Sequence, residues 1–286
     1  MIELFQQNAV FFLVTIFILG LLVGSFLNVV IYRLPIMMEN DWKEQCCDLL
    51  DLDSPDINKS FNLIIPRSRC PFCGHQIQAI ENIPVISYLF LKGKCSKCNS
   101  KISIRYPLIE IISAISITIV AYYFGVSIQT LSAIILTWTL ITLTMIDIDH
   151  QLLPDDITLP LLWLGLSINL FNVFTDINSS VLGAIFGYGI LWTVYISFKI
   201  VTGKEGMGHG DFKLLAALGA WFGWQSLPLI IILSSVVGAI IGISLIIFKS
   251  HDRNTQIPFG PYLAIAGLVY MLWGPYLMAV YLSTTL

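Results

Sequence analysis

Long, almost uninterrupted apolar runs recur along the whole chain. A helix that crosses a bilayer needs about 20 largely apolar residues. Eight runs approach this length: 10–31, 108–124, 131–146, 157–174, 181–198, 212–224, 227–248 and 258–282. The pattern therefore predicts about eight transmembrane helices. Whether the short run at 212–224 crosses the membrane completely stays open.

Composition narrows the class of protein further. Of the 286 residues, 56% are apolar and only 12% are charged, whereas soluble domains carry about 25% charged residues. The net charge is −3 and the mean hydropathy is +0.82. These values exclude a soluble globular enzyme, a disordered chain and a basic nucleic-acid-binding protein. We expect an all-α polytopic membrane protein whose surroundings are the lipid bilayer, with no nucleic-acid partner.

The basic residues predict the orientation. Ten of the 15 Lys and Arg side chains lie in 33–105. The other five lie in or beside two later connections, 199–211 and 249–257, which alternation of the spans puts on the same side as 33–105. They are Lys199, Lys204, Lys213, Lys249 and Arg253. Because basic residues flank spans on the cytoplasmic side, the insert between spans one and two is predicted to be cytoplasmic. Its acidic stretch 39–56 is interpreted as solvated linker or a short helix.

The predicted organisation thus has three parts. The first transmembrane helix occupies 1–33, and a cytoplasmic lobe occupies 34–106. The remaining seven helices, in 107–286, form a membrane domain.

All six cysteines lie between positions 46 and 98. Four of them form two C-x-x-C pairs, Cys70/Cys73 and Cys95/Cys98, and each such pair can offer two thiolates to one tetrahedral Zn²⁺. A reducing compartment argues against stable disulfides, so a structural zinc site is favoured over free thiols or a redox pair. His75 could replace one cysteine. Cys46 and Cys47 are adjacent, cannot readily bind the same ion and are left without a role.

Two acidic clusters stand at membrane edges, where ionisable groups are costly. Asp147 and Asp149 follow the third span, and Asp211 opens the sixth within Gly208-His-Gly-Asp211. Asp211 could simply cap its helix. A carboxylate at a helix C-terminus opposes the helix dipole, so Asp147 and Asp149 are harder to explain structurally. Carboxylates that meet at one depth can divide acid and base roles, which favours catalysis.

Several further motifs complete the pattern. They are Gly24-Ser-Phe-Leu-Asn-Val-Val-Ile-Tyr-Arg-Leu-Pro35, Pro66-Arg-Ser-Arg-Cys-Pro-Phe-Cys-Gly-His75, Glu81-Asn-Ile-Pro-Val-Ile-Ser-Tyr88, Gly93-Lys-Cys-Ser-Lys-Cys98, Ile104-Arg-Tyr-Pro-Leu-Ile-Glu110 and Leu153-Pro154-Asp155. Together with Asp147 and the G-x-G-D motif, they make the chain resemble the bacterial type IV prepilin peptidases, a family of membrane aspartyl proteases, over nearly its whole length. The stretch 39–60, which includes the acidic stretch 39–56, falls outside the family pattern.

The resemblance implies a bifunctional enzyme of the bacterial inner membrane with its active site at the cytoplasmic face. Such an enzyme cuts the basic leader from type IV prepilins or type II secretion pseudopilins. It then N-methylates the new N-terminal residue, usually Phe, from S-adenosylmethionine. By the same resemblance, Asp147 and Asp211 match the family's catalytic aspartates, and Cys70, Cys73, Cys95 and Cys98 match its cytoplasmic lobe.

The sequence does not reveal where the methyl donor binds. It contains no Gly-rich phosphate loop or dinucleotide-binding pattern, and Gly93, Lys94 and Glu110 are only candidates. Two other functions were weighed, a non-catalytic scaffold of a pilus or secretion machine and a proton-coupled transporter. A transporter would carry charges in the middle of its spans, and a scaffold would not need two facing aspartates, so both are disfavoured.

Overall fold

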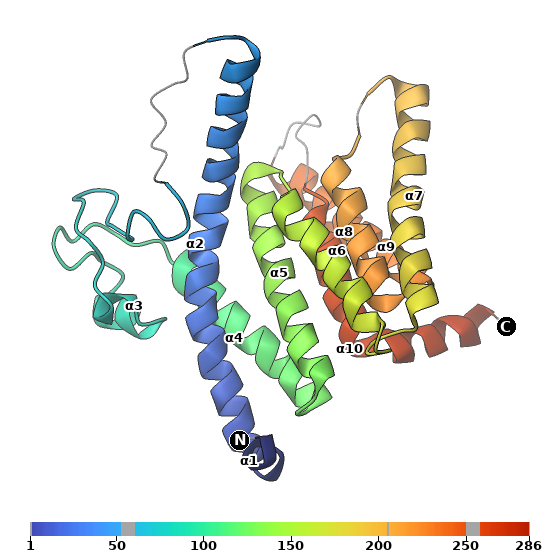
Figure 1. Cartoon of the computed structure of the whole chain (residues 1–286), viewed down its shortest axis with the longest axis horizontal. Coiled ribbons are helices and arrows are strands. Elements are labelled where there is room, and N and C mark those ends of the chain that lie inside the picture. The colour runs from blue at the N-terminus through green and yellow to red at the C-terminus, as the bar shows by residue number, and fades with distance from the viewer. Residues whose placement is uncertain (1, 53–60, 205, 250–257, 286) are drawn as a thin grey trace. The chain divides into compact units, whose positions relative to one another are not determined.

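The computed structural model describes residues 2–52, 61–204, 206–249 and 258–285. All regular elements in these ranges are helices, apart from two isolated β-bridges. The chain forms two compact units, Met1–Val126 and Ser127–Leu286 (Figure 1). The predicted boundaries at 33/34 and 106/107 separate membrane segments from the loop between them, whereas the two units are defined by contacts between residues. The predicted boundaries therefore stay a prediction.

The first unit contains two long helices and a lobe with little regular structure. Its elements are α1 (Ile2–Gln7), α2 (Ala9–Leu49), the 3-10 turn η1 (Ile80–Asn82), α3 (Ile86–Phe90) and α4 (Arg105–Phe124). We call residues 61–104, which join α2 to α4, the cysteine lobe. α2 is 41 residues long and continues through Pro35 well beyond the predicted first span. Most of the acidic stretch is therefore helical, with a Glu39–Lys43 ion pair of 2.7 Å, and its residues 53–56 lie outside the described ranges.

Small residues bring α2 and α4 into close contact. A Cβ atom on Gly20 would lie 2.5 Å from Cα of Ala114, and one on Gly24 would lie 2.8 Å from Cα of Glu110. Ser113 also donates its hydroxyl to the carbonyl of Gly20 over 2.8 Å. This is the small-residue packing typical of helices in membranes, where close backbone approach replaces the hydrophobic effect.

Arg33 attaches the cysteine lobe to α2. Its side chain is buried, and its two terminal nitrogens donate to the carbonyls of Asn62 (2.7 Å) and Pro66 (2.5 Å). The guanidinium also lies over the ring of Phe61, 5.5 Å from its centre. Because a buried guanidinium must have partners, Arg33 fixes the start of the lobe against the helix.

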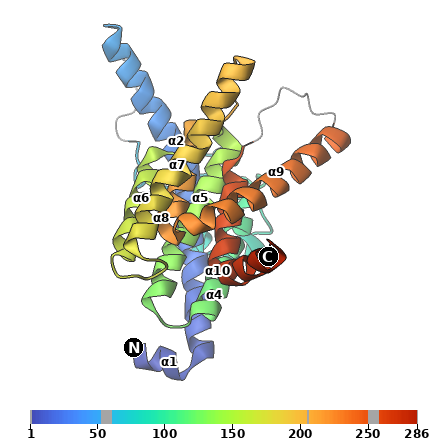
Figure 2. The ribbon, with the colours of Figure 1, turned by 90° about the vertical axis from the view of Figure 1, so that its right-hand side faces the viewer.

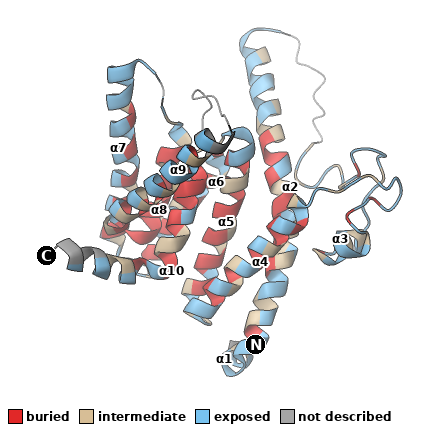
Figure 3. Ribbon diagram, turned by 180° about the vertical axis from the view of Figure 1, so that it is seen from behind, coloured by how far each residue is buried: buried red, intermediate tan, exposed pale blue. Residues whose placement is uncertain are grey.

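The second unit is a bundle built around one short helix. Its elements are α5 (Ile128–His150), α6 (Asp155–Asn169), α7 (Ile177–Thr202), α8 (His209–Phe222), η2 (Trp224–Ser226), α9 (Leu227–Lys249) and α10 (Gly260–Thr285). α8 packs against α6 and α7 (Figures 1 and 2). From Asp211 to Phe222, every residue of α8 except Lys213 is buried, as the colours of Figure 3 show.

A hydrogen-bond network closes the C-terminal end of α8. The side-chain amide of Asn169 donates to the carbonyls of Ala220 (2.8 Å) and Trp221 (2.9 Å), and Ser180 also donates to Ala220. A helix that ends inside a bundle leaves carbonyls without partners, and burying them unsatisfied in an apolar surrounding is costly. Asn169 and Ser180 therefore allow α8 to stop after 14 residues.

The all-helical class is confirmed, and a helix occurs at each of the eight predicted runs. Six of the described helices are long and apolar enough to cross a membrane: α2, α4, α5, α7, α9 and α10. The prediction that the run at 212–224 is the shortest agrees with α8. The fourth run forms α6, which has only 15 residues. The chain is thus a multi-pass membrane protein.

Candidate active site and metal centre

Asp147 lies in the last turn of α5, and its side chain is buried. Its Oδ2 accepts a hydrogen bond of 3.0 Å from the N–H of Gly260, the first residue of α10. A Cβ on Gly260 would lie 2.6 Å from that same oxygen. Only glycine at position 260 therefore lets the start of α10 approach the carboxylate so closely.

Asp211 lies in the first turn of α8 and is also buried. Its carboxylate is close enough to Asp147 for the two charges to interact. Helix N-termini favour negative charge, and Gly208, whose Cβ would lie 3.8 Å from Oδ2 of Asp211, leaves space beside the carboxylate. The two aspartates that the sequence singled out are therefore brought together, although 64 residues separate them.

Leu153 packs between the start of α8, which carries Asp211, and the start of α10, whose Gly260 binds Asp147. A Cβ on Gly210 would lie 2.7 Å from Cβ of Leu153, and a Cβ on Gly260 would lie 3.2 Å from its Cδ2. Leu153 itself is buried. The Leu-Pro motif thus acts as an apolar spacer at the base of the site, with Pro154 leading into α6.

An ion pair joins the starts of α6 and α8 beside the site. Lys213 Nζ lies 2.7 Å from both carboxylate oxygens of Asp155. Sequence reasoning placed both residues near the site but did not pair them. It also missed Gly260, for which the only signal was the turn-forming sequence Pro258-Phe-Gly-Pro261 in front of the last apolar run.

Asp149, the other candidate after the third span, is exposed. Residues i and i+2 of a helix face different directions, so Asp149 does not share the buried position of Asp147. Burial therefore distinguishes Asp147, the aspartate that the family resemblance matched, from Asp149.

The four cysteines of the two C-x-x-C pairs form a second site, in the first unit. Their sulfur atoms all lie within 4.8 Å of one another, with Cys70–Cys98 at 3.8 Å and Cys73–Cys95 at 3.9 Å. Tetrahedral zinc with Zn–S bonds of about 2.3 Å requires sulfur–sulfur distances of about 3.8 Å. The cluster therefore fits a structural Zn²⁺.

Two similar turns present the cysteines. Cys70 donates its N–H to the carbonyl of His75 (2.8 Å), as Cys95 does to that of Ser100 (2.9 Å). In the first turn Gly74 takes a positive φ of 69°, and in the second Asn99 takes one of 56°. Each turn is flanked by one isolated β-bridge, Arg69–Gln76 or Lys94–Lys101.

The protein surroundings of the sulfurs favour thiolates at part of the cluster. Hydrogen bonds from the Cys73 N–H and from the Ser100 hydroxyl lower the pKa of Cys70 to about 6. For Cys73 the His75 N–H acts in the same direction, but burial and the neighbouring thiols outweigh it and raise the pKa to about 11. Four sulfurs this close repel one another as anions, and a divalent cation relieves that repulsion.

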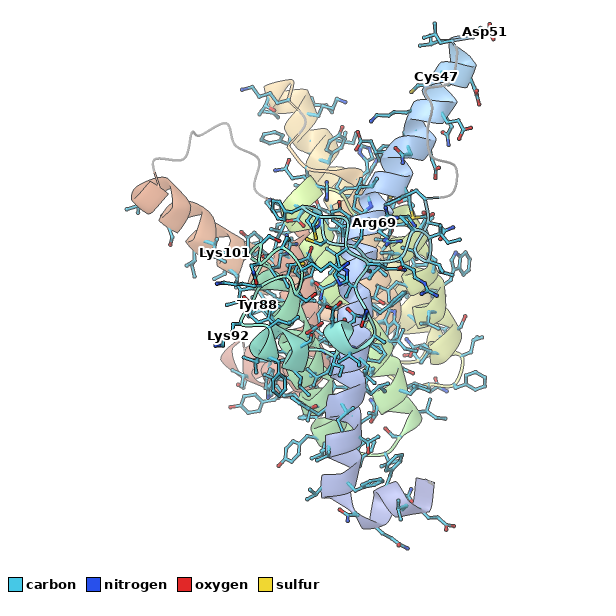
Figure 4. All side chains as sticks on the ribbon, turned by 90° about the vertical axis from the view of Figure 1, so that its left-hand side faces the viewer. Cys47, Asp51, Arg69, Tyr88, Lys92 and Lys101 are labelled. Atoms are coloured by element: carbon cyan, nitrogen blue, oxygen red, sulfur yellow. The ribbon has the colours of Figure 1, made fainter. Side chains whose placement is uncertain are left out.

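The other metal candidates do not join the cluster. His75 Nε2 lies 3.1 Å from Oε2 of Glu81. His75 is thus paired with a carboxylate and lies outside the group of four possible zinc ligands. Cys46 and Cys47 lie on the distal part of α2, and Cys47 is labelled at that end in Figure 4.

The methyl-donor candidates lie along one stretch of the cysteine lobe and α4. Gly93 has a φ of 66°, and a Cβ there would lie 2.9 Å from the hydroxyl of Tyr88. The buried Glu110 accepts the N–H of Val85 at 2.7 Å. Lys94 is exposed at the β-bridge with Lys101.

Fold and sites thus define a multi-pass membrane protein with two buried, interacting aspartates in one unit and a four-cysteine cluster in the other. Family models match both parts. Residues 18–124 match the bacterial peptidase A24 N-terminal domain, and residues 134–243 match the type IV leader peptidase family.

Curated relatives match almost end to end. A protein of Stutzerimonas stutzeri is 55% identical, covering 99% of this chain and 98% of its own. Relatives from Pseudomonas aeruginosa (51%; 99% and 98% covered) and Legionella pneumophila (46%; 92% of each) are also similar. All three are named prepilin leader peptidase/N-methyltransferase. No solved structure matches. The chain belongs to the type IV leader peptidase family.

Proposed function

We propose that this protein cleaves the basic leader from type IV prepilins, type II secretion pseudopilins or both, and then N-methylates the new N-terminal residue. The relatives' shared name supports both activities, at 46–55% identity over nearly the whole chain. Cleavage would take place at the cytoplasmic face of the bacterial inner membrane, where the basic connections of the chain are expected to lie.

One observation carries the peptidase half of the proposal: two buried carboxylates from distant helix ends interact, Asp147 on α5 and Asp211 on α8. Two carboxylates that interact in a buried site do not both ionise readily, so the pair favours holding one proton. The ionised aspartate takes a proton from water while the water oxygen attacks the scissile carbonyl carbon. The protonated aspartate donates its proton to the carbonyl oxygen. Collapse of the tetrahedral intermediate then breaks the C–N bond and protonates the leaving amine. The pair acts as a unit.

The methyltransferase half needs different groups. S-adenosylmethionine would supply the methyl group, and the substrate amine must be neutral for its lone pair to attack the methyl carbon. Gly93, Lys94 and Glu110 remain the candidates for donor binding. They are linked by the segment from Val85 to Gly93, since Val85 bonds Glu110 and Tyr88 contacts Gly93.

Zinc would hold the cysteine lobe together rather than take part in either reaction. The cysteine lobe belongs to the proposed cytoplasmic part, residues 34–106, and the proposed peptidase domain comprises 107–286. The lobe has little regular structure of its own, so binding of the metal would contribute much of its folding free energy.

Co-expression of the full chain with one prepilin tests the function directly. The proposal predicts a product that lacks the leader and carries one methyl group on its new N-terminus, as measured by mass spectrometry. The same prepilin expressed alone is the control and should keep its leader. An uncut prepilin in the presence of correctly inserted protein would contradict the peptidase assignment, and a cut but unmethylated one would contradict the methyltransferase assignment.

A further inference from the structure

One part of the cysteine lobe exposes a concentrated group of large apolar side chains. In the segment 80–91, Ile80 is 76% exposed, Leu89 68% and Phe90 82%. Ile83 and Ile86 are exposed as well. Figure 3 shows α3, in the middle of this segment, largely in the colours of exposed and intermediate residues. An exposed apolar group of this density marks a surface that meets a membrane or a partner.

A hydrogen bond to α4 sets the depth of this segment. Val85, which precedes α3, donates its N–H to Oε2 of Glu110 over 2.7 Å. Glu110 lies five residues after Arg105, the first residue of α4, and five residues of helix advance about 7.5 Å. Val85 therefore lies beside the first turns of a membrane-crossing helix.

The second long helix of the unit confirms this depth. A Cβ on Gly24 of α2 would lie 2.8 Å from Cα of Glu110, so Glu110 lies beside the last two turns of the apolar run 10–31 of α2. Figure 1 likewise shows α3 alongside the first turns of α4. Val85 has a φ of 58°, which β-branched residues avoid, and the bond to Glu110 helps to hold it there.

The residues that follow the segment carry positive charge. Residues 80–105 contain five basic side chains and one acidic one, Glu81, which is paired with His75. Lys92, Lys94 and Lys101 are exposed. Figure 4 shows Tyr88, Lys92 and Lys101 on the same side of the unit, well away from Cys47 and Asp51 at the end of α2. Lysine and tyrosine beside an apolar group are typical of the membrane interface.

We propose that the segment 80–91 lies in the interfacial layer of the bilayer, in the leaflet that α4 enters at Arg105. Its isoleucines, Leu89 and Phe90 contact acyl chains, and the lysines that follow contact anionic headgroups. The segment is thus a third membrane contact of the first unit, besides α2 and α4. It holds the cysteine lobe on the membrane surface, where the N-terminus of a membrane-embedded substrate emerges. The other conceivable occupant is the apolar helix of a protein substrate.

Photo-crosslinking distinguishes these occupants. The full-length protein is placed in vesicles of phosphatidylethanolamine and phosphatidylglycerol, with p-benzoylphenylalanine replacing Phe90 in one sample and Phe72 in another. Phe72 is a matched control, because it is 75% exposed but lies between Cys70 and Cys73, outside the segment. After illumination, mass spectrometry should find phospholipid adducts at position 90 and only background at position 72. No adduct at 90, equal adducts at both positions, or adducts at 90 only with an added prepilin would overturn the proposal.

A second variant tests whether the apolar group itself is responsible. Leu89→Asp, combined with the photoreactive residue at position 90, should reduce the lipid adduct severalfold, since a carboxylate avoids the acyl layer. Zinc content is measured in parallel and should be unchanged, which shows that the lobe is folded. An undiminished adduct in zinc-loaded Leu89→Asp protein would contradict the proposal.

Discussion

The N–H of Gly260 donates to Oδ2 of Asp147 over 3.0 Å, across 113 residues of chain. The bond fixes the rotamer of a carboxylate at the end of α5 from the start of α10. It also gives the buried Asp147 one of the hydrogen bonds that a carboxylate out of water requires.

Gly260→Ala should therefore impair cleavage severely. The new Cβ would stand 2.6 Å from Oδ2, and displacing a catalytic group by about 1 Å can cost roughly 100-fold in rate. Gly189→Ala on α7 is the control, because a Cβ there has no neighbour within 4 Å. Both variants are assayed for prepilin cleavage after their membrane insertion is verified. Equal activity of the two would contradict a tight contact at Gly260.

The Asp155–Lys213 ion pair should matter more for activity than for stability. Lys213 is partly and Asp155 largely exposed, and such pairs contribute about 0.2–1 kcal/mol. Because the pair joins the starts of α6 and α8 next to Asp211, Lys213→Met should lower the cleavage rate severalfold with little change in melting temperature. The exchange Asp155→Lys with Lys213→Asp should restore part of the rate. A melting temperature that falls in proportion to activity would show that the pair is merely structural.

Loss of any one ligand should release zinc. Cys95→Ser leaves three sulfurs in the cluster, so we expect metal analysis of the purified protein to find little zinc and limited proteolysis to cut the lobe faster. Cys47→Ser, on α2 and outside the cluster, is the matched control and should keep one zinc per chain. Wild-type protein that contains no zinc and four free thiols would rule out the site.

The two reactions should be separable through Gly93. Valine at this positive φ would force its Cβ to within 2.9 Å of the Tyr88 hydroxyl and rearrange the turn that carries Lys94. Gly93→Val should therefore reduce methylation of an already cleaved pilin more than it reduces cleavage of the prepilin. Zinc content serves as the folding control. Equal loss of both activities in zinc-loaded protein would remove Gly93 from the donor site.

Apolar runs predicted where the helices lie, because a helix surrounded by lipid needs an apolar side chain at almost every position. They could not predict that α2 continues to Leu49, since its second half is held by local helix propensity and an ion pair rather than by lipid. Nor could they show that α6 is short or how α8 can end inside the bundle, because the end of α8 depends on Asn169, a residue about 50 positions earlier.

The candidate sites divide in the same way. Spacing alone predicted the four-cysteine cluster, since two C-x-x-C turns suit one ion. Asp147 and Asp211 were recognised as matches to a family motif, but their burial depends on how α5, α8 and α10 pack. For the same reason the apolar and charge pattern could not find Gly260, and only the family resemblance separated Asp147 from Asp149. Such partners are determined by tertiary contacts between distant segments.

The most direct test of the central claim compares three isosteric variants in one cleavage assay. Asparagine keeps the size of aspartate but cannot ionise, and removing a positioned acid or base costs roughly 10²–10⁴-fold. We expect Asp147→Asn and Asp211→Asn each to lose at least about 100-fold in prepilin cleavage, whereas Asp149→Asn should stay close to wild type. Full cleavage by Asp147→Asn or Asp211→Asn, or an equal loss in Asp149→Asn, would contradict the central claim.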